Sequence, residues 1–238
     1  MKKLTVMIPC YNEESGIVKV IKRIPKKRLH KLGYKTEVLV IDNNSNDNTT
    51  AVARKAGAKV VSEKRQGKGY AIRKGVRSIS SDIDLVVMLD GDNTYDPKEM
   101  LRMIEPLDSG FCDVVIGTRL GGKISKGSMT LFNRTGNWFF TFLVRTWYHG
   151  NVTDVCTGYF SWKKSVLKKL SKHLESNGFS IEMEMITKMA KMNFQIYSIP
   201  ITYDNRAGDS SLRPIHDGRK ILKAYVRNLF WKPGVRRR

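Results

Sequence analysis

The clearest indication of the fold is the segment Leu85-Val86-Val87-Met88-Leu89-Asp90-Gly91-Asp92-Asn93-Thr94-Tyr95-Asp96-Pro97. It begins with an unbroken apolar run, which is typical of a strand buried on both faces of a sheet. Two carboxylates, Asp90 and Asp92, stand one residue apart directly after that strand. The continuation Asp96-Pro97-Lys98-Glu99 has the pattern of a helix start, with an aspartate cap and a proline at the first helical position. The stretch therefore predicts a central strand that turns over its carboxyl edge into a helix.

Asp90 and Asp92 are candidate metal ligands. In open α/β sheets, ligands bind at the carboxyl edge of the strands. Two oxygen donors on one tight turn suit Mg²⁺ or Mn²⁺, which is held by one or two carboxylates together with substrate phosphates. The alternative is a solvated acidic turn that caps a helix. The buried strand in front of the turn favours the metal site.

Outward from this stretch, short apolar strands alternate with helical segments. In the first half we expect strands at 4–8, 38–41, 58–61 and 85–89, with helices opening at 13 and spanning 49–56 and 70–77. In the second half we expect strands at 113–117, 158–162 and 194–203, helices at 166–173, 179–192 and 217–230, an aromatic, basic segment at 126–149 and a polar loop at 204–213. Such alternation forms βαβ units. The predicted fold is α/β: a mostly parallel sheet flanked by helices, with a mixed C-terminal half.

The composition is that of a folded, strongly basic chain. Its 238 residues are 41% hydrophobic, enough for a full core, and carry a formal net charge of +21. This charge implies an anionic partner: nucleic acid, anionic lipid or a phosphorylated substrate. The three cysteines form no CxxC pair, which favours reduced thiols in a reducing compartment. No secretory leader is visible and no apolar run approaches the ~18 residues of a membrane span, so we expect a protein that is soluble or lies on a membrane surface.

Polar side chains follow three of the predicted parallel strands, in the turn Pro9-Cys10-Tyr11-Asn12, at Asp42, and at Asp90 and Asp92. The carboxyl ends of parallel strands share one edge of the sheet. A nucleotide bound there would find Asp42 for its base or ribose, Lys68 for its diphosphate and a metal on Asp92. The alternatives are a helix-capping role for Asp42 and a solvated Lys68. Neither GxxxxGK(S/T) nor GxGxxG follows the first strand, which disfavours a Walker-type phosphate loop and a dinucleotide oxidoreductase.

Four segments of the first half carry a family pattern. They are Ile8-Pro9-Cys10-Tyr11-Asn12-Glu13-Glu14, Val40-Ile41-Asp42-Asn43-Asn44-Ser45-Asn46-Asp47-Asn48-Thr49, Gly67-Lys68-Gly69-Tyr70-Ala71-Ile72-Arg73-Lys74-Gly75 and Asp90-Gly91-Asp92. In order and spacing they resemble the GT-A family 2 glycosyltransferases, which use nucleotide-diphosphate sugars and a divalent metal. One departure is Asn43-Asn44, where the family more often has an acidic residue and glycine, and this leaves the preferred base open.

The resemblance implies a single GT-A (Rossmann-like) catalytic domain over residues 1–238. It divides into a nucleotide-sugar half at 1–117, an acceptor half at 118–216 and a basic amphipathic C-terminal helix with a tail at 217–238. The residues that it assigns to the nucleotide sugar are Pro9, Tyr11, Glu13, Asp42, Lys68, Asp90 and Gly91. It assigns Mg²⁺ or Mn²⁺ to Asp90 and Asp92.

Segments of the second half narrow the resemblance. They are Gly117-Thr118-Arg119, Asn133-Arg134-Thr135-Gly136-Asn137, Asp154-Val155-Cys156-Thr157-Gly158-Tyr159, Phe179-Ser180-Ile181-Glu182-Met183-Glu184, and Arg206-Ala207-Gly208-Asp209-Ser210-Ser211-Leu212-Arg213 followed by Asp217-Gly218. They resemble the polyprenyl-phosphate (dolichyl-phosphate) hexose synthases, which move mannose, glucose or a similar sugar onto a lipid phosphate. By this resemblance the acceptor phosphate would be held by Arg119, Arg134, Arg206, Ser210 and Arg213, and the catalytic residues would be Asp92, Arg119 and Arg206.

The expected reaction inverts the anomeric configuration, because the acceptor attacks from the face opposite the leaving nucleotide diphosphate. Asp92 with its metal would neutralise the charge on that diphosphate. A phosphate acceptor, with a second pKa of about 6, needs no strong base, and arginines can orient it. A glycan hydroxyl, the alternative acceptor, would need a carboxylate base. Asp154 and Glu182 are the candidates for that base, each with a structural alternative as a cap or ion-pair partner. The sequence from Asp92 to Pro97 favours a UDP-sugar over GDP-mannose as the donor.

Two segments have the composition of helices that lie in a membrane interface. Residues 129–149 interleave aromatic side chains with Arg134 and Arg145, and from Arg219 onward there are eight Lys/Arg and no acid. Each basic residue near an anionic leaflet contributes about 1 kcal/mol, so we expect peripheral binding to an anionic membrane surface on the cytoplasmic face. The alternatives are a core helix at 129–149 and a solvated C-terminal helix. Many relatives continue into transmembrane helices, so this chain is expected either to be peripheral or to rely on a separate membrane partner.

A nucleic-acid-binding protein is the remaining alternative, and it rests on charge alone. The aromatic residues cluster with apolar residues at helical spacing, and no DNA- or RNA-binding signature is present. We therefore expect no nucleic-acid partner.

Overall fold

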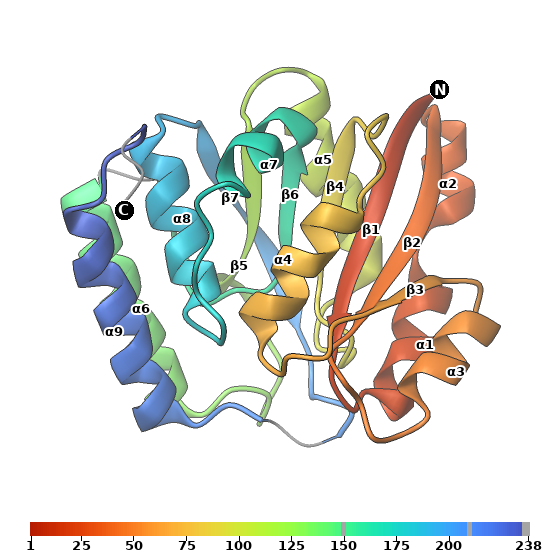
Figure 1. Cartoon of the computed structure of the whole chain (residues 1–238), viewed down its shortest axis with the longest axis horizontal. Helices are drawn as coiled ribbons and strands as arrows, with labels where there is room; N and C mark the ends of the chain where they lie inside the picture. Colours follow the sequence, from red (N-terminus) through yellow and green to blue (C-terminus); the bar gives the residue numbers. More distant parts are fainter. Residues whose placement is uncertain (149–150, 209–210, 235–238) are drawn as a thin grey trace.

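The computed structural model describes residues 1–148, 151–208 and 211–234. Its centre is a seven-stranded sheet with the order β3-β2-β1-β4-β6-β5-β7 (Figure 1). The strands are β1 (Lys2–Cys10), β2 (Tyr34–Asp42), β3 (Lys59–Ser62), β4 (Leu85–Met88), β5 (Val114–Ile124), β6 (Phe160–Lys163) and β7 (Ile196–Tyr203). All pairs are parallel except those of β6, which runs antiparallel to both β4 and β5. The mostly parallel sheet and the mixed second half are thus confirmed.

Helices cover both faces of the sheet, because successive strand residues point to opposite sides. In β1, Met7 packs on one face, while Val6 and Ile8 pack on the other. The face with Val6 is covered by α1 (Glu14–Arg23), α2 (Lys26–Lys31), α3 (Thr49–Lys55) and α5 (Met100–Asp108), which follows the 3-10 turn η1 (Pro97–Glu99). The face with Met7 is covered by α4 (Lys68–Ser78), α6 (Leu131–Tyr148), α7 (Lys164–Leu170), α8 (Ile181–Lys191) and α9 (Pro214–Leu229). The sheet therefore lies between two helical layers.

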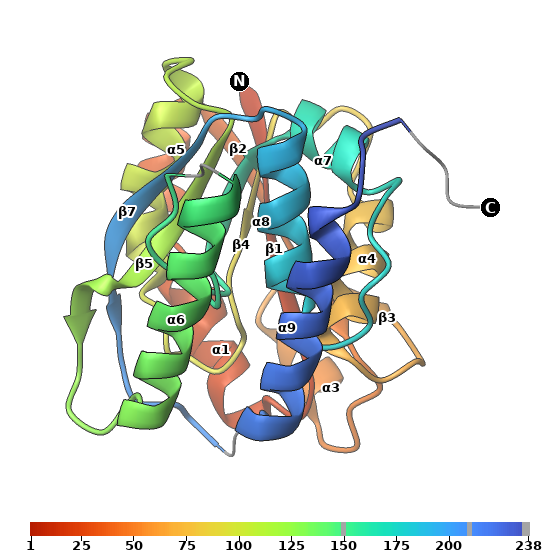
Figure 2. The ribbon, with the colours of Figure 1, turned by 90° about the vertical axis from the view of Figure 1, so that its left-hand side faces the viewer.

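Helix α8 corrects the expectation of an amphipathic helix at 179–192. Every residue from Ile181 to Met189 is buried, Glu182 and Glu184 included. The reason is that α9 packs over α8, so that α8 lies between α9 and the rest of the fold (Figure 2). Both carboxylates of α8 are consequently held inside the protein and must find partners there.

Strand β5 extends well past the predicted end at residue 117. Glycines usually weaken strands, yet β5 continues through Gly121 and Gly122. Here they serve a close approach, because a Cβ on Gly122 would lie 2.0 Å from the carbonyl oxygen of Ile201 in β7. The register of β5 and β7 shifts between Thr118 and Lys123, as in a β-bulge. The short helix α2 was not predicted at all.

Across the described ranges, no helix has both the length and the apolar character that crossing a bilayer requires. The segment at 126–149 forms α6 from Leu131 onward, and it buries Asn137, Thr141, Val144 and Tyr148 against the protein. Its other faces leave Trp138, Phe142 and Trp147 exposed. Helix α6 is therefore partly a packed helix and partly an apolar surface.

Candidate active site

Asp92 lies at the carboxyl edge of the sheet, on a turn that it stabilises itself. Its Oδ1 accepts the backbone N–H of Thr94 at 3.0 Å and the hydroxyl of Thr94 at 2.6 Å. Burial, followed by the charge of Asp90, raises the pKa of Asp92. The other oxygen, Oδ2, lies 2.8 Å from Nη1 of Arg206. One oxygen of Asp92 thus fixes the turn, and the second is directed at a cation.

Arg206 is placed by the backbone that precedes and follows it. The N–H of Asp204 donates to the carbonyl of Thr94 at 2.8 Å, and the N–H of Ala207 donates to the carbonyl of Asp92 at 2.9 Å. The guanidinium also pairs with Glu13. Burial, together with Asp92 and Asp90, raises the pKa of Glu13 to about 8, although Arg206 opposes that shift. The chain therefore brings a cation to the Asp90–Asp92 turn from a residue far along the sequence.

Lys68 ties Asp90 to Glu182. Its Nζ lies 2.8 Å from Oδ1 of Asp90 and 2.8 Å from Oε1 of Glu182. Burial disfavours the ammonium, but Asp90 and Glu182 outweigh it and raise the pKa of Lys68. Burial also raises the pKa of Glu182. The ammonium is therefore held in place between a residue of the Asp90–Asp92 turn and a residue of α8.

Gly158 leaves the space that the Asp90 carboxylate occupies. A Cβ at this position would lie 2.3 Å from Oδ2 of Asp90. The N–H of Gly158 donates to the hydroxyl of Tyr95 at 2.8 Å, which holds the glycine against the turn. A side chain at residue 158 must therefore displace either Asp90 or the turn.

Gly158→Ala should lower the affinity for a nucleoside diphosphate by about tenfold or more, since the methyl group pushes Asp90 away from Lys68. The measurement is calorimetric titration of the folded variant with UDP and Mn²⁺. Gly136→Ala is the control, because a Cβ there meets no atom within 4 Å. Equal affinities for Gly158→Ala and the original protein would contradict the prediction.

Arg119 and Asp154 form a buried, bidentate ion pair. Nε and Nη2 of Arg119 donate to the two carboxylate oxygens at 2.8 Å each, and the backbone N–H of Arg119 adds a third bond at 2.8 Å. Asn137 donates a fourth at 2.7 Å. The side chain of Asp154 has no exposed surface. With its acceptors filled in this way, Asp154 has the geometry of the structural alternative rather than that of a free base.

A cavity of about 1100 Å³ gathers most of the predicted residues. Those that line it are Pro9, Tyr11, Glu13, Lys68, Asp90, Gly91, Asp92, Arg119, Glu182, Arg206 and Arg213. Asp42 is buried outside this lining, and its Oδ1 accepts the N–H of Ser45 at 3.3 Å, a bond within the turn and not at the start of α3, whose N-cap is Asn48. Arg134 is exposed on α6 and does not line the cavity. Ser210 lies outside the described residues. Asp154 does not line the cavity but pairs with Arg119, which does.

Asn43 lines the cavity although the sequence analysis did not assign it to the site. Its Oδ1 accepts the N–H of Gly67 at 2.7 Å, and its Nδ2 donates to the carbonyls of Arg65 at 2.7 Å and Glu63 at 3.2 Å. It thus fixes the segment that leads into Lys68. The departure from the family pattern at Asn43-Asn44 was the signal that could have identified it.

The donor set at the turn suits a divalent metal whose remaining ligands are supplied by a substrate. In the part of the chain that the structure describes, no three His, Cys, Asp or Glu side chains gather as a metal cluster. Asp90 and Asp92 supply two carboxylates, and Mg²⁺ is commonly held by one or two carboxylates plus phosphate oxygens. The residues present therefore suit a metal that is bound together with a diphosphate.

The family model for glycosyl transferase family 2 matches residues 5–171. The chain belongs to this family. The match confirms the resemblance that was drawn from the four segments of the first half. In the glycosyltransferase, the matched region contains Lys68, the Asp90–Asp92 turn, Arg119 and Asp154.

Two curated relatives from Haloferax volcanii are similar to the glycosyltransferase over most of its length. Glycosyltransferase AglJ is 36% identical over 230 residues, which are 93% of this chain and 71% of AglJ. A dolichyl-phosphate hexose transferase is 32% identical over 226 residues, which are 94% of this chain and 92% of that protein.

A solved structure confirms the GT-A fold. Glucosyl-3-phosphoglycerate synthase from Mycobacterium tuberculosis, crystallised with Mn²⁺, UDP and phosphoglyceric acid, superposes with a TM-score of 0.75. The sequences are 22% identical, and the match covers 98% of the glycosyltransferase and 80% of that chain. At this identity the likeness concerns the fold alone.

Proposed function

We propose that this glycosyltransferase moves a hexose from a nucleoside diphosphate sugar onto a polyprenyl or dolichyl phosphate, with inversion, at a membrane surface. The observation that carries the proposal is the composition of its cavity. Its lining combines charged side chains that are buried or half-buried, namely Lys68, Asp90, Asp92 and Glu182, with apolar side chains that are half-buried or exposed, namely Phe132, Phe139, Leu212, Pro214 and Ile215. A charged donor and an apolar acceptor tail are the two ligands that such a cavity suits.

The donor half of the proposal rests on the Asp90–Asp92 turn. Asp90 and Asp92 would hold the metal, as the resemblance implies, and Mn²⁺ with UDP accompanies the solved GT-A neighbour. A bound divalent metal supplies Lewis-acid neutralisation of the leaving diphosphate. Lys68 holds Asp90 in place and adds a positive charge beside it. For Asp92 to reach the metal, Arg206 must share or give up its 2.8 Å contact with Oδ2.

The acceptor half rests on three arginines of the cavity. Arg119, Arg206 and Arg213 all line the cavity. Arg119 is already oriented by Asp154, so that its guanidinium needs little further ordering to meet a phosphate. An ionised phosphate is itself the nucleophile and requires no general base. This agrees with the geometry of Asp154, whose oxygens are occupied.

The membrane part of the proposal rests on the outer surface of α6 and α9, which lie side by side (Figure 2). Exposed apolar side chains on these helices and just beyond them are Leu131, Phe132, Trp138, Phe139, Phe142, Trp147, Ile215, Leu222, Val226 and Phe230. Exposed basic side chains on the same helices are Arg134, Arg145, Arg219, Lys220 and Lys223. An apolar patch with interspersed cations favours an anionic membrane surface, which we place on the cytoplasmic side.

A transfer assay tests the proposal. The purified protein with Mn²⁺ or Mg²⁺ would receive labelled UDP-glucose, UDP-N-acetylglucosamine or GDP-mannose and a short polyprenyl phosphate. We expect label in the organic phase with one donor, and its loss with EDTA. Arg206→Ala should fold and fail to transfer. Arg119→Ala should fail to transfer as well, and its folding is checked by its melting temperature, because it leaves the buried Asp154 without its counter-charge. Retained transfer in both variants would contradict the acceptor half.

The assay also separates the alternative acceptors. Phosphoglycerate, which accompanies the solved neighbour, and a glycan hydroxyl acceptor would be offered in parallel. Transfer to either of these with none to the lipid would overturn the lipid acceptor and leave the nucleotide-sugar half standing. Release of free sugar without transfer would likewise overturn the lipid acceptor and leave the nucleotide-sugar half standing.

A further inference from the structure

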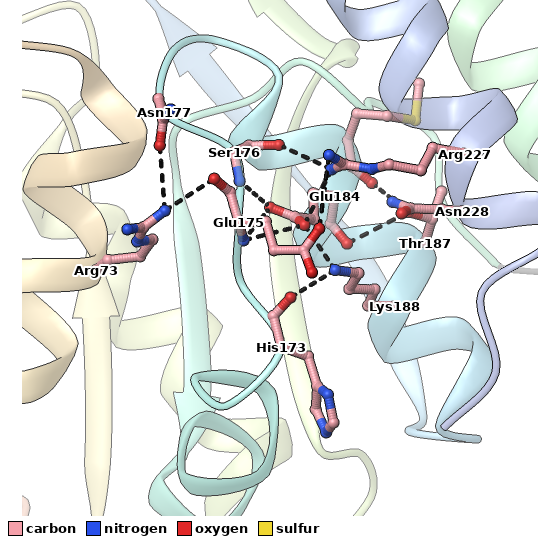
Figure 3. Close-up of polar contacts among 11 residues, drawn as sticks. Arg73, His173, Glu175, Ser176, Asn177, Glu184, Thr187, Lys188, Arg227 and Asn228 are labelled. Carbon is pink, nitrogen blue, oxygen red and sulfur yellow. Dashed lines mark hydrogen bonds and ion pairs between the residues drawn. The ribbon is translucent and has the colours of Figure 1, made fainter. Parts of the chain in front are cut away.

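A buried polar network joins α8, α9 and the segment 173–178 (Figure 3). At its centre is Glu184, whose side chain has no exposed surface. The carboxylate accepts the backbone N–H groups of Glu175 at 3.1 Å and Ser176 at 2.7 Å. It also accepts Nζ of Lys188 at 2.6 Å and Nη2 of Arg227 at 3.2 Å. Removing its charge would therefore leave two cations and two backbone donors competing for fewer acceptors.

The segment 173–178 is held by side chains from three helices. Lys188 of α8 donates to the carbonyl of His173. Arg227 of α9 lies 3.4 Å from the hydroxyl of Ser176. Arg73 of α4 donates to the carbonyl of Glu175 at 2.8 Å and to Oδ1 of Asn177 at 3.2 Å. These three side chains are cations and bind only oxygen atoms of the segment. Glu184 is the anchor that accepts its backbone N–H groups, those of Glu175 and Ser176.

On its other side, the segment caps the helix that carries Lys68. The carbonyl of Asn177 accepts the N–H of Gly69 at 2.9 Å and the N–H of Tyr70 at 3.3 Å. These are donors of the first turn of α4, which have no partner inside the helix. The N-cap residue is Gly67, so no side chain at that position can satisfy them. The cap of α4 is therefore supplied by a carbonyl from a distant segment.

The contact between segment and helix start is close enough to require glycine. A Cβ on Gly67 would lie 2.2 Å from the carbonyl oxygen of Asn177, and a Cβ on Gly69 would lie 2.1 Å from that of Ser176. Gly67 also has a φ of +138°, in the region that disfavours side chains. The two glycines on either side of Lys68 thus let the segment rest directly on the backbone of the helix start.

We propose that Glu184 is a positioning residue for the donor site. It holds the segment 173–178, the segment caps the start of α4, and the first residue of α4 is Lys68, whose ammonium binds Asp90 and Glu182. Glu184 itself does not line the cavity. The inference rests on the proposed function in so far as Lys68 serves a nucleoside diphosphate sugar.

Glu184→Gln tests this positioning by two independent measurements. An amide of nearly the same shape cannot accept from all four donors, so the Asn177 cap on α4 should loosen. Hydrogen exchange at the amides of Gly69 and Tyr70 should become at least about tenfold faster, well below the melting temperature. The dissociation constant for UDP with Mn²⁺ should rise by a similar factor, while the KM for the acceptor stays unchanged.

Lys191→Met is the matched control. Lys191 also joins α8 to the end of α9, because its Nζ donates to the carbonyls of Leu229 and Trp231. These bonds do not involve the segment 173–178, whose contact with Trp231 is made by the ring of His173. Lys191→Met should lower the melting temperature without changing exchange at Gly69 or UDP affinity. Gly69→Ala attacks the same contact from the side of α4 and should reproduce the loss of UDP affinity even if Glu184→Gln fails to fold.

Two results would overturn the inference. The first is unchanged exchange at Gly69 and Tyr70 in folded Glu184→Gln. The second is an equal loss of UDP affinity in Lys191→Met and Glu184→Gln at equal loss of melting temperature, which would make the effect one of general stability. If the original protein binds neither UDP nor GDP, the proposed function fails, and the exchange measurement still decides whether Glu184 holds the start of α4.

Discussion

Replacing Asp92 by asparagine is expected to lower the rate of sugar transfer by about 10²–10³-fold, since a preorganised charge that stabilises the leaving diphosphate is lost. Asparagine can still accept from Thr94, so the turn itself should persist. The measurement is kcat/KM for the donor, together with the rise in melting temperature that Mn²⁺ and UDP cause. That rise should be present in the original protein and absent in Asp92→Asn.

Asp96→Asn is the control for this experiment, because the same chemical change is made four residues further along. Asp96 caps η1 by accepting the N–H of Lys98 at 3.0 Å, and asparagine caps helices about as well. Asp96 does not line the cavity, so donor kinetics should stay within about twofold of the original. An Asp92→Asn protein that keeps a tenth or more of the original rate would refute the assigned role of Asp92.

Replacing Asp154 by asparagine is expected to lower the free energy of unfolding by about 3–5 kcal/mol, since it leaves the buried guanidinium of Arg119 without its counter-charge. The measurement is unfolding in urea at neutral pH. Asp113→Asn is the control, because its pair with Lys163 is partly exposed at 3.3 Å and should be worth less than about 1 kcal/mol.

The double variant Asp154→Asn with Arg119→Met separates the roles of Asp154. If Asp154 acts by neutralising Arg119, removing both charges should recover much of the lost stability. If Asp154 were instead the base for a hydroxyl acceptor, Asp154→Asn would remain stable and lose turnover alone. A stable, inactive Asp154→Asn would therefore refute the structural role and favour the alternative acceptor.

The turn at Asp90 and Asp92 was predictable because its signal is local. A buried strand, two carboxylates and a helix start follow one another within one short stretch, and the parallel sheet then defines the edge on which they lie. The same reasoning assigned Lys68 to this edge, whereas Glu13 and Arg206 were assigned only through the family resemblance, since they meet each other and Asp92 from distant parts of the chain.

Asp42 shows how the end of a strand can be misjudged by one residue. The expected strand ended at residue 41 and left Asp42 on the turn, whereas β2 runs through Asp42. The carboxylate then serves the turn that follows, and Asn43, the first residue after the strand, lines the cavity. The end of β2 is set by its pairing with β1, in which Cys10 lies opposite Asp42, and a local pattern does not show that pairing.

Glu184 could not be recognised from the sequence. The sequence assigned it no role of its own, and its burial depends on α9 and the segment 173–178, which pack against α8. Its partners come from α8, α9 and the segment 173–178, which no local pattern connects. Much of the cavity lining was therefore predictable from the sequence, whereas the network that holds the start of α4 was not.

The external cap on α4 also sets an order of events during synthesis. Arg73 and Asn177, which meet at this cap, are 104 residues apart in the chain. While the ribosome has made only the first half, β1 and β4 can already pair, but the start of α4 has no acceptor for its first amides. The nascent protein can thus acquire its sheet early, and it completes the pocket around Lys68 only after α8 has emerged and folded.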